Sequence, residues 1–339
     1  MKARPKRFAN SSRSLRVAWR VMAILGLAAY KLMRVGLLVI VVASLVAYFG
    51  AWHKLFDLAA QLRLQFLVGA TICLAFTLGK RQWRWSAIAI LGIALNFWPI
   101  ARWYLPKQES VSSQRRLKLV QFNVLYLNNR YQAVLDFLRE EQPDIVTLQE
   151  ITDDWVAGLA PLSTQFADVR IEPGNQGSGI AIYSRIQFDQ AETLVLSSDQ
   201  RLNLLVKFTW EGRQLSLLTT HPQNPFGENR FEWRNEQLAA TAQLLNSLPE
   251  PKILIGDLNI TMWSPYYQKL VTDAQLVNTR EGHGLIPTWP AKILLPFLMI
   301  PIDHCLVSRD IEVAAIRTGR SLGSDHLPLV VELIVPTQK

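Results

Sequence analysis

The stretch Ile253-Leu254-Ile255-Gly256-Asp257-Leu258-Asn259 joins an apolar run to two short polar side chains. The run is typical of a buried strand that ends at Gly256. Because side chains alternate along an extended backbone, Asp257 and Asn259 would project from the same face of its end. Taken alone, the pattern is equally typical of a simple turn, since Asp and Asn are frequent turn residues. The rest of the chain has to decide between these two interpretations.

Polar clusters also follow the other predicted strands. Together with the first stretch there are six of them, namely Phe122-Asn123, Leu148-Gln149-Glu150, Thr219-Thr220-His221-Pro222, Gly256-Asp257-Leu258-Asn259, Ile302-Asp303-His304 and Ser324-Asp325-His326. Carboxylate, amide and imidazole groups at the ends of successive strands would meet at one edge of a sheet sandwich. The pattern therefore predicts one shared site.

Short strands and amphipathic helices alternate from Leu117 onward. The predicted strands are Leu117–Phe122, Ile145–Leu148, Gly179–Tyr183, Leu204–Trp210, Leu215–Thr220, Lys252–Ile255, Ile302–Val307 and Val330–Ile334, and the predicted helices are Arg130–Glu141, Glu228–Leu248 and Trp263–Asp273. Strands outnumber helices. This favours a mixed α/β domain of two packed sheets with outer helices.

The net charge of +9 comes from the N-terminus. Residues 1–34 contain nine Lys and Arg and no carboxylate. From Lys107 to Lys339 there are 21 Lys and Arg against 26 Asp and Glu, a net charge of −5. The basic pI of the whole chain is therefore no sign of a nucleic-acid groove in the C-terminal domain.

Three apolar segments follow the basic arm, namely Val35–Trp52, Leu64–Gly79 and Trp85–Ala101, the last continuing past Arg102 to Trp103 and Tyr104. We expect three transmembrane helices. The short middle segment has the alternative of being a core or interfacial helix. Val21–Tyr30 is too short to span and would extend the arm along the membrane surface.

Lys and Arg in short loops predict the orientation. The arm and the loop Lys80-Arg81-Gln82-Trp83-Arg84 would stay in the cytoplasm, so the C-terminal domain would lie outside, in the periplasm of a bacterial cell with an outer membrane. The protein would be a multi-pass protein of the inner membrane. If the middle segment does not cross, the domain lies in the cytoplasm. The predicted divisions are the arm 1–34, the transmembrane region 35–104, a polar linker 105–116 and the domain 117–336.

The residue types at the strand ends suggest hydrolysis of phosphate esters. Glu150, Asp325 and Asn123 offer the hard oxygen ligands that suit Mg²⁺ or Mn²⁺. His221 and His326 can donate to phosphoryl oxygens and transfer protons near neutral pH. Asp257 can orient or deprotonate an attacking water.

The six motifs in this order resemble the endonuclease/exonuclease/phosphatase superfamily, most closely its bacterial membrane-anchored members. The resemblance covers about Leu117 to Pro336 and implies a four-layer α/β sandwich that hydrolyses phosphodiesters or phosphomonoesters with a metal ion. By position, Glu150 would be the main metal ligand, with Asn123 and Asp325 near it.

The same resemblance assigns roles to the other motif residues. Asp257 would activate the water, Asn259 would help to hold the water and the phosphate, and His221 would stabilise the pentacovalent phosphorus centre. His326, oriented by Asp303, would act as acid, base or phosphate contact. Leu125 stands where some nuclease branches carry an acid, which argues against a second metal of that type.

Residues outside the motifs are less defined. His304 would face the opposite side of its strand from Asp303. Asn224, Arg230 and Arg234 follow the His221 motif and are weaker predictions for phosphate contacts, with solvated loop and helix positions as the alternative. Cys73 and Cys305 are not expected to pair.

The apolar segment Leu285 to Pro301 before Asp303 could reach a lipid surface, hold an apolar substrate group, or simply pack over the core. The predicted partners are the membrane and a phosphate-ester substrate, either a nucleic acid or a lipid-linked phosphate, and no protein partner. Three functions therefore remain possible from the sequence: a nuclease-like phosphoesterase, a lipid-phosphate or phospholipase C-like hydrolase, and a binding module without turnover.

Overall fold

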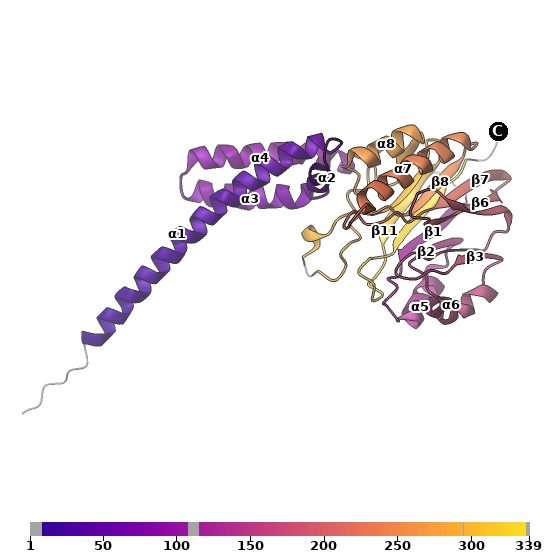
Figure 1. Cartoon of the computed structure of the whole chain (residues 1–339), viewed down its shortest axis with the longest axis horizontal. Coiled ribbons are helices and arrows are strands. Elements are labelled where there is room, and N and C mark those ends of the chain that lie inside the picture. The colour runs from indigo at the N-terminus through magenta and orange to yellow at the C-terminus, as the bar shows by residue number, and fades with distance from the viewer. Residues whose placement is uncertain (1–8, 108–114, 294, 337–339) are drawn as a thin grey trace, which may run out of the picture.

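The computed structural model describes residues 9–107, 115–293 and 295–336, which form a helical bundle joined to an α/β domain (Figure 1). The bundle projects from one side of the domain. Most of the predicted linker, residues 108–114, lies outside the described residues.

Two six-stranded sheets build the C-terminal domain. The first contains β1 (Arg116–Asn123), β2 (Ile145–Gln149), β3 (Asp168–Glu172), β4 (Ile180–Ser184), β11 (Glu312–Thr318) and β12 (Leu329–Ile334), in the order β11-β12-β1-β2-β4-β3. The second contains β5 (Phe188–Val195), β6 (Leu202–Trp210), β7 (Arg213–Thr219), β8 (Lys252–Asp257), β9 (Leu276–Asn278) and β10 (Asp303–Ser308), in the order β5-β6-β7-β8-β10-β9.

The main core lies between the two sheets, where Ile182, Leu217 and Val331 are fully buried. Helices α5 (Tyr131–Glu141) and α6 (Asp153–Gly158) pack on the outer face of the first sheet, and α7 (Arg230–Ser247) and α8 (Pro265–Asp273) on that of the second. Short 3-10 turns lie at Ala160–Thr164 (η3) and Pro296–Leu298 (η4). The predicted four-layer α/β sandwich is confirmed.

The strand pairing brings the polar clusters to one edge. β1 and β2 are parallel, as are β7 and β8, and the ends of the two pairs meet, since Asn123 donates to Asp257 and Gln149 donates to Thr219. β10 runs antiparallel to β8 and places its first residue, Asp303, opposite Asp257, the last residue of β8. The carboxyl ends of four strands and the start of a fifth therefore surround one place.

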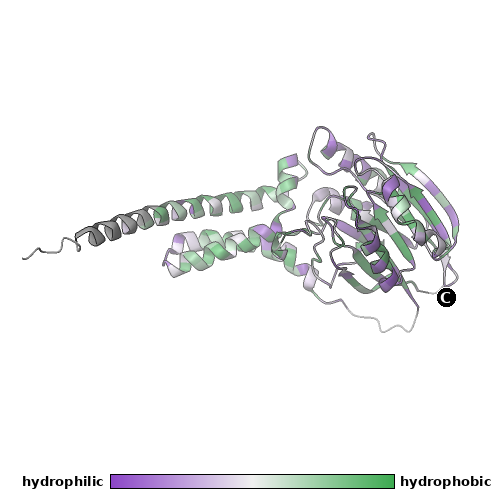
Figure 2. Cartoon of the chain, turned by 90° about the horizontal axis from the view of Figure 1, so that it is seen from below, coloured by the Kyte–Doolittle hydropathy of each residue, from purple (hydrophilic) through white to green (hydrophobic). Residues whose placement is uncertain are grey.

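The N-terminal bundle consists of α1 (Ala9–Val46), η1 (Ala47–Phe49), α2 (Lys54–Ala60), α3 (Arg63–Gly79), α4 (Trp83–Ala101) and η2 (Arg102–Tyr104). Two helical stretches, Leu25–Phe49 and Trp83–Tyr104, are long and apolar enough to cross a membrane, and their ribbons are largely hydrophobic in Figure 2. The pair α2 and α3 forms a third if it counts as one span bent by 66°. These helices are compatible with membrane association.

The first apolar helix differs from the prediction. Val21–Tyr30 is no separate interfacial segment, because it lies within the single helix α1. The apolar stretch starts at Leu25 and ends at Phe49, not at Val35 and Trp52. The cation Arg34 is tolerated there because its guanidinium lies over the rings of Tyr30 and Trp85, 4.0 and 4.6 Å from their centres.

Helix α2 docks onto the C-terminal domain through buried polar contacts. The carboxylate of Asp57 accepts from Arg234 Nη2 on α7 at 2.9 Å and from the hydroxyl of Ser264, and Asp57 and Arg234 are both fully buried. Gln61 Oε1 accepts from the backbone N–H of Thr261 at 2.6 Å. The bundle therefore contributes buried groups to the domain that follows it.

Candidate active site

Asp257 reaches the site because β8 and the end of β7 approach each other closely. A Cβ atom at Gly256 would lie 2.1 Å from the carbonyl oxygen of Thr220, so only glycine fits there. The next residue, Asp257, is almost fully buried, and its Oδ1 accepts from the backbone N–H of Asn259 at 2.9 Å. This turn, in which Asn259 has a left-handed φ of 51°, fixes both side chains at the strand end.

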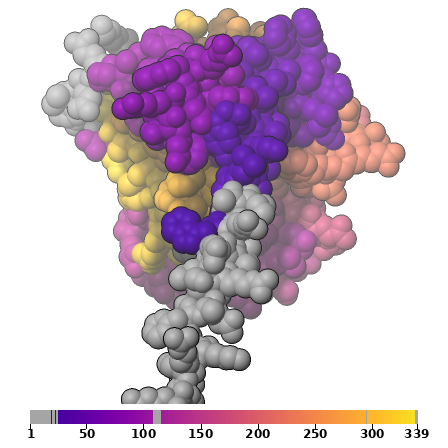
Figure 3. Space-filling view, turned by 90° about the vertical axis from the view of Figure 1, so that its left-hand side faces the viewer, coloured from indigo at the N-terminus to yellow at the C-terminus, as the bar shows by residue number. Residues whose placement is uncertain are grey.

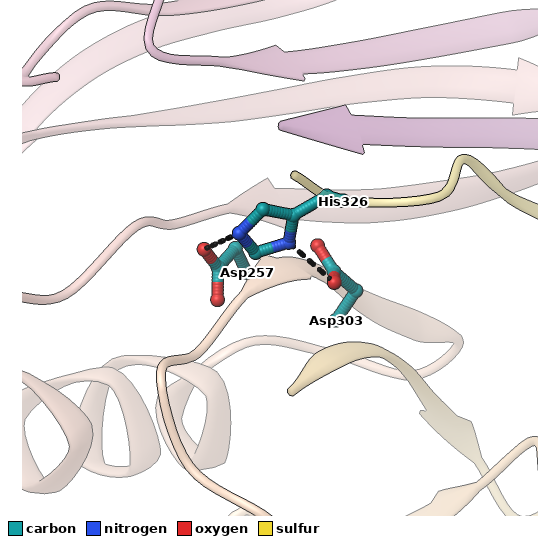
Figure 4. Close-up of side chains that lie close together, drawn as sticks. All are labelled: Asp257, Asp303 and His326. Atoms are coloured by element: carbon teal, nitrogen blue, oxygen red, sulfur yellow. Dashed lines mark hydrogen bonds and ion pairs between the residues drawn. The ribbon is translucent and has the colours of Figure 1, made fainter. Parts of the chain in front are cut away.

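Asp257, His326 and Asp303 form a buried row, in which one contact is a hydrogen bond and the other an ion pair (Figure 4). His326 Nδ1 donates to Asp303 Oδ2 at 2.8 Å, and its Nε2 lies 3.6 Å from Asp257 Oδ2. Burial alone would lower the pKa of His326, but the two carboxylates raise it to about 10. His326 is therefore an imidazolium at neutral pH.

The carboxyl group of Asp257 is ionised for the complementary reason. Its burial would raise the pKa, but His326, His221 and the amide of Asn123 hold the pKa well below its usual value. The result is a buried ion pair, in which the carboxylate of Asp257 can accept a hydrogen bond and the imidazolium of His326 can donate one.

His221 is oriented by Arg201, a residue that the sequence patterns do not single out. Arg201 Nη1 lies 3.2 Å from His221 Nδ1 and donates to Gly177 O at 2.9 Å. Because a guanidinium can only donate, Nδ1 must accept, and a neutral His221 carries its proton on Nε2. That nitrogen lies 3.4 Å from Asp257 Oδ2, so His221 points a donor into the site.

Glu150 and Asn123 face the same pocket. Glu150 has a left-handed φ of 65°, an unusual conformation for a residue other than glycine, and this turns its carboxylate toward β1. Asn123 Nδ2 donates to Glu150 Oε1 and to Asp257 Oδ2, both at 3.0 Å. Asn123 Oδ1 accepts from Leu125 N, so Asn123 presents its amide nitrogen, not an oxygen, to the two carboxylates. Direct metal binding by Asn123 stays a prediction, and this geometry favours a bridging role.

Asp325 has an oxygen free to bind a cation. Its Oδ2 accepts from Trp289 Nε1 at 3.0 Å, while its Oδ1 is buried and has no hydrogen-bond partner. An unpaired buried carboxylate oxygen is costly unless an ion or another group completes it. The unpaired Oδ1 of Asp325 therefore suits a divalent metal ion, which prefers oxygen ligands.

Among the His, Cys, Asp and Glu side chains in the described part of the chain, one group of three lies close enough together to hold a metal. The ligand atoms of Asp257, Asp303 and His326 all lie within 4.8 Å of one another. A histidine has to lose its proton to bind a metal, whereas the carboxylates around His326 favour its protonated form. The group therefore holds a protonated imidazole between two carboxylates, and metal binding by Glu150 and Asp325 stays a prediction.

Gln121 is a second residue to which the sequence patterns assign no role. Its amide nitrogen donates to Asp303 Oδ1 and to Gln149 Oε1, both at 2.7 Å, and all three side chains are buried. Gln121 thus fixes the carboxylate that orients His326. Gln149 belongs to a motif quoted above and Gln121 lies in the predicted strand Leu117–Phe122, but the sequence alone does not show which partner each amide finds.

The weaker predictions have mixed outcomes. Arg234 is neither a phosphate contact nor a solvated residue, because it is buried and paired with Asp57. Its Nη1 lies 3.5 Å from Asn259 O, beside the strand-end turn. Asn224 and Arg230 are exposed at the entrance after β7, where substrate contact stays a prediction. His304 turns away from Asp303: its Nε2 donates to Ile260 O at 2.8 Å, and its ring lies 4.8 Å from that of Tyr267 on α8.

Comparison with known proteins agrees with this geometry. A sequence model of the Endonuclease/Exonuclease/phosphatase family matches residues 120–326, which include all six polar clusters. Among curated proteins, none matches the sequence significantly.

Solved structures share the fold at low sequence identity. The D. rerio TDP2 complexed with a single-strand DNA product is 18% identical, with a TM-score of 0.54, covering 65% of this chain and 99% of that chain. The human nocturnin catalytic domain with bound sulfate is 19% identical, with a TM-score of 0.55, covering 67% of this chain and 97% of that chain. The Neisseria 3′ phosphatase NExo bound to a product DNA hairpin is 20% identical, with a TM-score of 0.56, covering 64% of this chain and 99% of that chain. All three lack a counterpart for about a third of this chain.

Proposed function

The chain belongs to the Endonuclease/Exonuclease/phosphatase family, whose members hydrolyse phosphate esters, and we propose that this member is a membrane-anchored hydrolase that depends on Mg²⁺ or Mn²⁺. The observation that carries the proposal is the buried row of Asp257, His326 and Asp303, with His221 beside it. It combines an ionised base with two imidazole donors at the strand ends of this fold.

Each side chain has a task in this proposal. Asp257 takes a hydrogen bond and then the proton from the attacking water, and Asn259 holds that water and the phosphate. His326 and His221 donate to the phosphoryl oxygens, on which negative charge increases in the transition state. Asp303 keeps His326 protonated and oriented.

Glu150 and Asp325 would hold the metal ion, with Asn123 fixing the position of Glu150. When bound, such an ion neutralises charge on the phosphoryl oxygens. The amide of Asn123 also joins Glu150 to Asp257, so the metal ligand and the base keep a constant spacing.

The test uses the full chain in detergent micelles with Mg²⁺ and a panel of an oligonucleotide, a soluble phosphomonoester and phospholipids. We expect Asp257→Ala to lower kcat about 10³-fold on whichever ester is cleaved, because the general base is lost. Asp273→Ala, in the exposed last turn of α8, is the control and should keep full activity. Equal turnover by wild type and Asp257→Ala would refute the proposal.

Metal binding separates an enzyme from a binding module without turnover. We expect Mn²⁺ titration by calorimetry to detect one site, and Glu150→Gln to weaken binding roughly tenfold or more. Wild-type protein that binds no divalent ion would favour the non-catalytic alternative.

We further propose that the helices span the inner membrane of a bacterial cell and that the domain lies in the periplasm. Helix α1 and α4 run toward the domain and α3 runs away from it, so the basic loop 80–84 and the basic arm belong to the same end of the bundle (Figure 1). Both would then be cytoplasmic. An alkaline phosphatase fused after Pro336 should be active and one fused after Arg84 inactive; the reverse result would place the domain inside.

A further inference from the structure

The long connection between β9 and β10 joins the active site to the helical bundle. At its base, Trp289 pairs with Ile300, its indole donates to Asp325 Oδ2, and the N–H of Ala291 donates to Asp325 O at 2.7 Å. At its tip, η4 packs on α3, where Gln65 Nε2 donates to Phe297 O at 3.1 Å. Gln65 lies in the first turn of α3, the end of that helix nearest the domain.

The tip of this connection is apolar and exposed. Ile293, Leu295, Phe297 and Leu298 are each 37–49% exposed, and we call these four residues the apolar tip. Lys292 beside them is exposed as well. Contiguous exposed apolar side chains mark a contact with protein or membrane, and an adjacent cation suits anionic lipid headgroups.

The apolar tip lies at the level where the helices would leave the bilayer. Aromatic side chains collect at the domain end of the bundle, where Tyr48, Trp52, Trp98 and Tyr104 are more than half exposed. Such aromatic residues are typical of the membrane surface. In the view along the bundle, the gold surface around residues 290–300 lies beside the helices, on the side of the domain from which the bundle projects (Figure 3).

The other exposed apolar residues of the domain share this edge. Within residues 115–293 and 295–336, the large apolar side chains that are exposed are the apolar tip, Tyr126 and Leu127 after β1, Val195 at the end of β5, and Phe226 after β7. All belong to strand ends or loops on the active-site edge. The N–H of Tyr126 donates to Glu150, so this rim borders the metal site directly.

We propose that the apolar tip enters the bilayer surface and that the active site faces the lipid headgroups, so that its substrate is a phosphate ester carried by a membrane lipid. This inference rests on the proposed function and adds the substrate class. The net charge of −5 from Lys107 to Lys339 agrees with it, because nucleic-acid grooves are usually basic.

A probe at the tip tests the contact without using activity. Phe297→Cys in the full chain is labelled with an environment-sensitive fluorophore and reconstituted in phosphatidylcholine–phosphatidylglycerol vesicles; the native Cys73 and Cys305 are buried. Arg309→Cys, after β10 at the opposite edge, is the control. We expect doxyl-labelled lipids to quench the probe at position 297 at least threefold more strongly than at 309. Equal quenching would overturn the proposal.

Activity tests the substrate class. We expect the triple variant Leu295→Ser, Phe297→Ser, Leu298→Ser to lower kcat/KM for a phospholipid or lipid phosphate in vesicles at least tenfold, and to stay within twofold of wild type on a soluble ester. Arg309→Ser should match wild type on both. Cleavage of an oligonucleotide but of no lipid would refute the lipid proposal and leave the proposed function intact. No hydrolysis of any ester by wild type would instead refute the proposed function.

Discussion

Arg201 determines which ring nitrogen of His221 carries the proton. Arg201→Met removes the only donor to Nδ1 that the described residues provide, so the imidazole can rotate or change its tautomer. We expect kcat to fall about 10²-fold with little change in KM, because misplacement of a donor affects the transition state most. Steady-state kinetics on the cleaved ester provide the check. A rise in KM at constant kcat would assign Arg201 to substrate binding instead.

His304 predicts a pH dependence of stability. Burial, reinforced by Arg280, lowers its folded-state pKa to about 3, whereas an unfolded histidine titrates near the usual 6.5. Its contribution to stability is complete above pH 6.5 and is lost as the pH falls toward 3, at up to about 1.4 kcal/mol per pH unit. His326 has a raised pKa, so its contribution changes above pH 6.5 and leaves this window unaffected.

Thermal unfolding of the full chain in detergent between pH 7 and 5 measures the effect. His304→Asn should reduce the pH dependence in this range, at the expense of lower stability at pH 7. His283→Asn, at an exposed position, should unfold like wild type at every pH. An unchanged slope in His304→Asn would contradict the prediction.

The residues of the site differ in how visible they are in the sequence. Asp257, Asn259, Asp303, Asp325 and His326 stand in short motifs beside predicted strands, and the order of these motifs predicts that they meet at one edge. Arg201 stands at the start of an ordinary strand, with no motif around it. Only the folded chain shows that β6 brings it to the His221 loop, because this contact spans two strands and depends on their register.

At the scale of secondary structure elements, α2 is the best example of a segment whose role the sequence conceals. Within an apolar region, Asp57 stands out only as an isolated acid, and Arg234 looks like one of several cations on a helix. Their partnership links positions 177 residues apart, so no local pattern predicts it. It makes α2 a part of the active-site support, since Arg234 also reaches the carbonyl oxygen of Asn259.

We expect Asp57→Ala to destabilise the full chain by about 3–5 kcal/mol, because Arg234 is left as a buried charge without a partner. Replacing both residues, by Asp57→Leu with Arg234→Met, should recover much of that loss. Thermal unfolding in detergent measures each variant. If the double variant is as unstable as Asp57→Ala, the loss comes from packing and not from the unpaired charge.

The strands that the sequence did not predict have one property in common. β3, β5, β9 and β11 are the edge strands of the two sheets. Edge strands are covered on fewer sides than central strands. The residues of β5 are half-buried or exposed along its length, so this strand lacks the apolar run that identifies a central strand. The central strands, which carry the site, were all predicted.

At the scale of the whole molecule, the sequence predicted the fold class and the apolar helices, but it did not predict how the bundle contacts the domain. The apolar helices are visible as apolar runs. Their attachment is not, because it depends on single polar contacts such as Trp263 Nε1 to Pro99 O at 3.0 Å and the ion pair of Lys107 with Glu281.

The docking of α2 has a kinetic consequence. If the bundle spans the membrane as proposed, a domain fixed to it would keep its active site at a constant height above the bilayer and would meet a lipid substrate by lateral diffusion in two dimensions. Turnover on vesicles should then follow the mole fraction of the lipid ester in the membrane, and dilution with an inert lipid at constant bulk concentration should lower the rate. The same geometry selects substrates by depth, since the phosphorus atom has to lie near the headgroup plane to be reached.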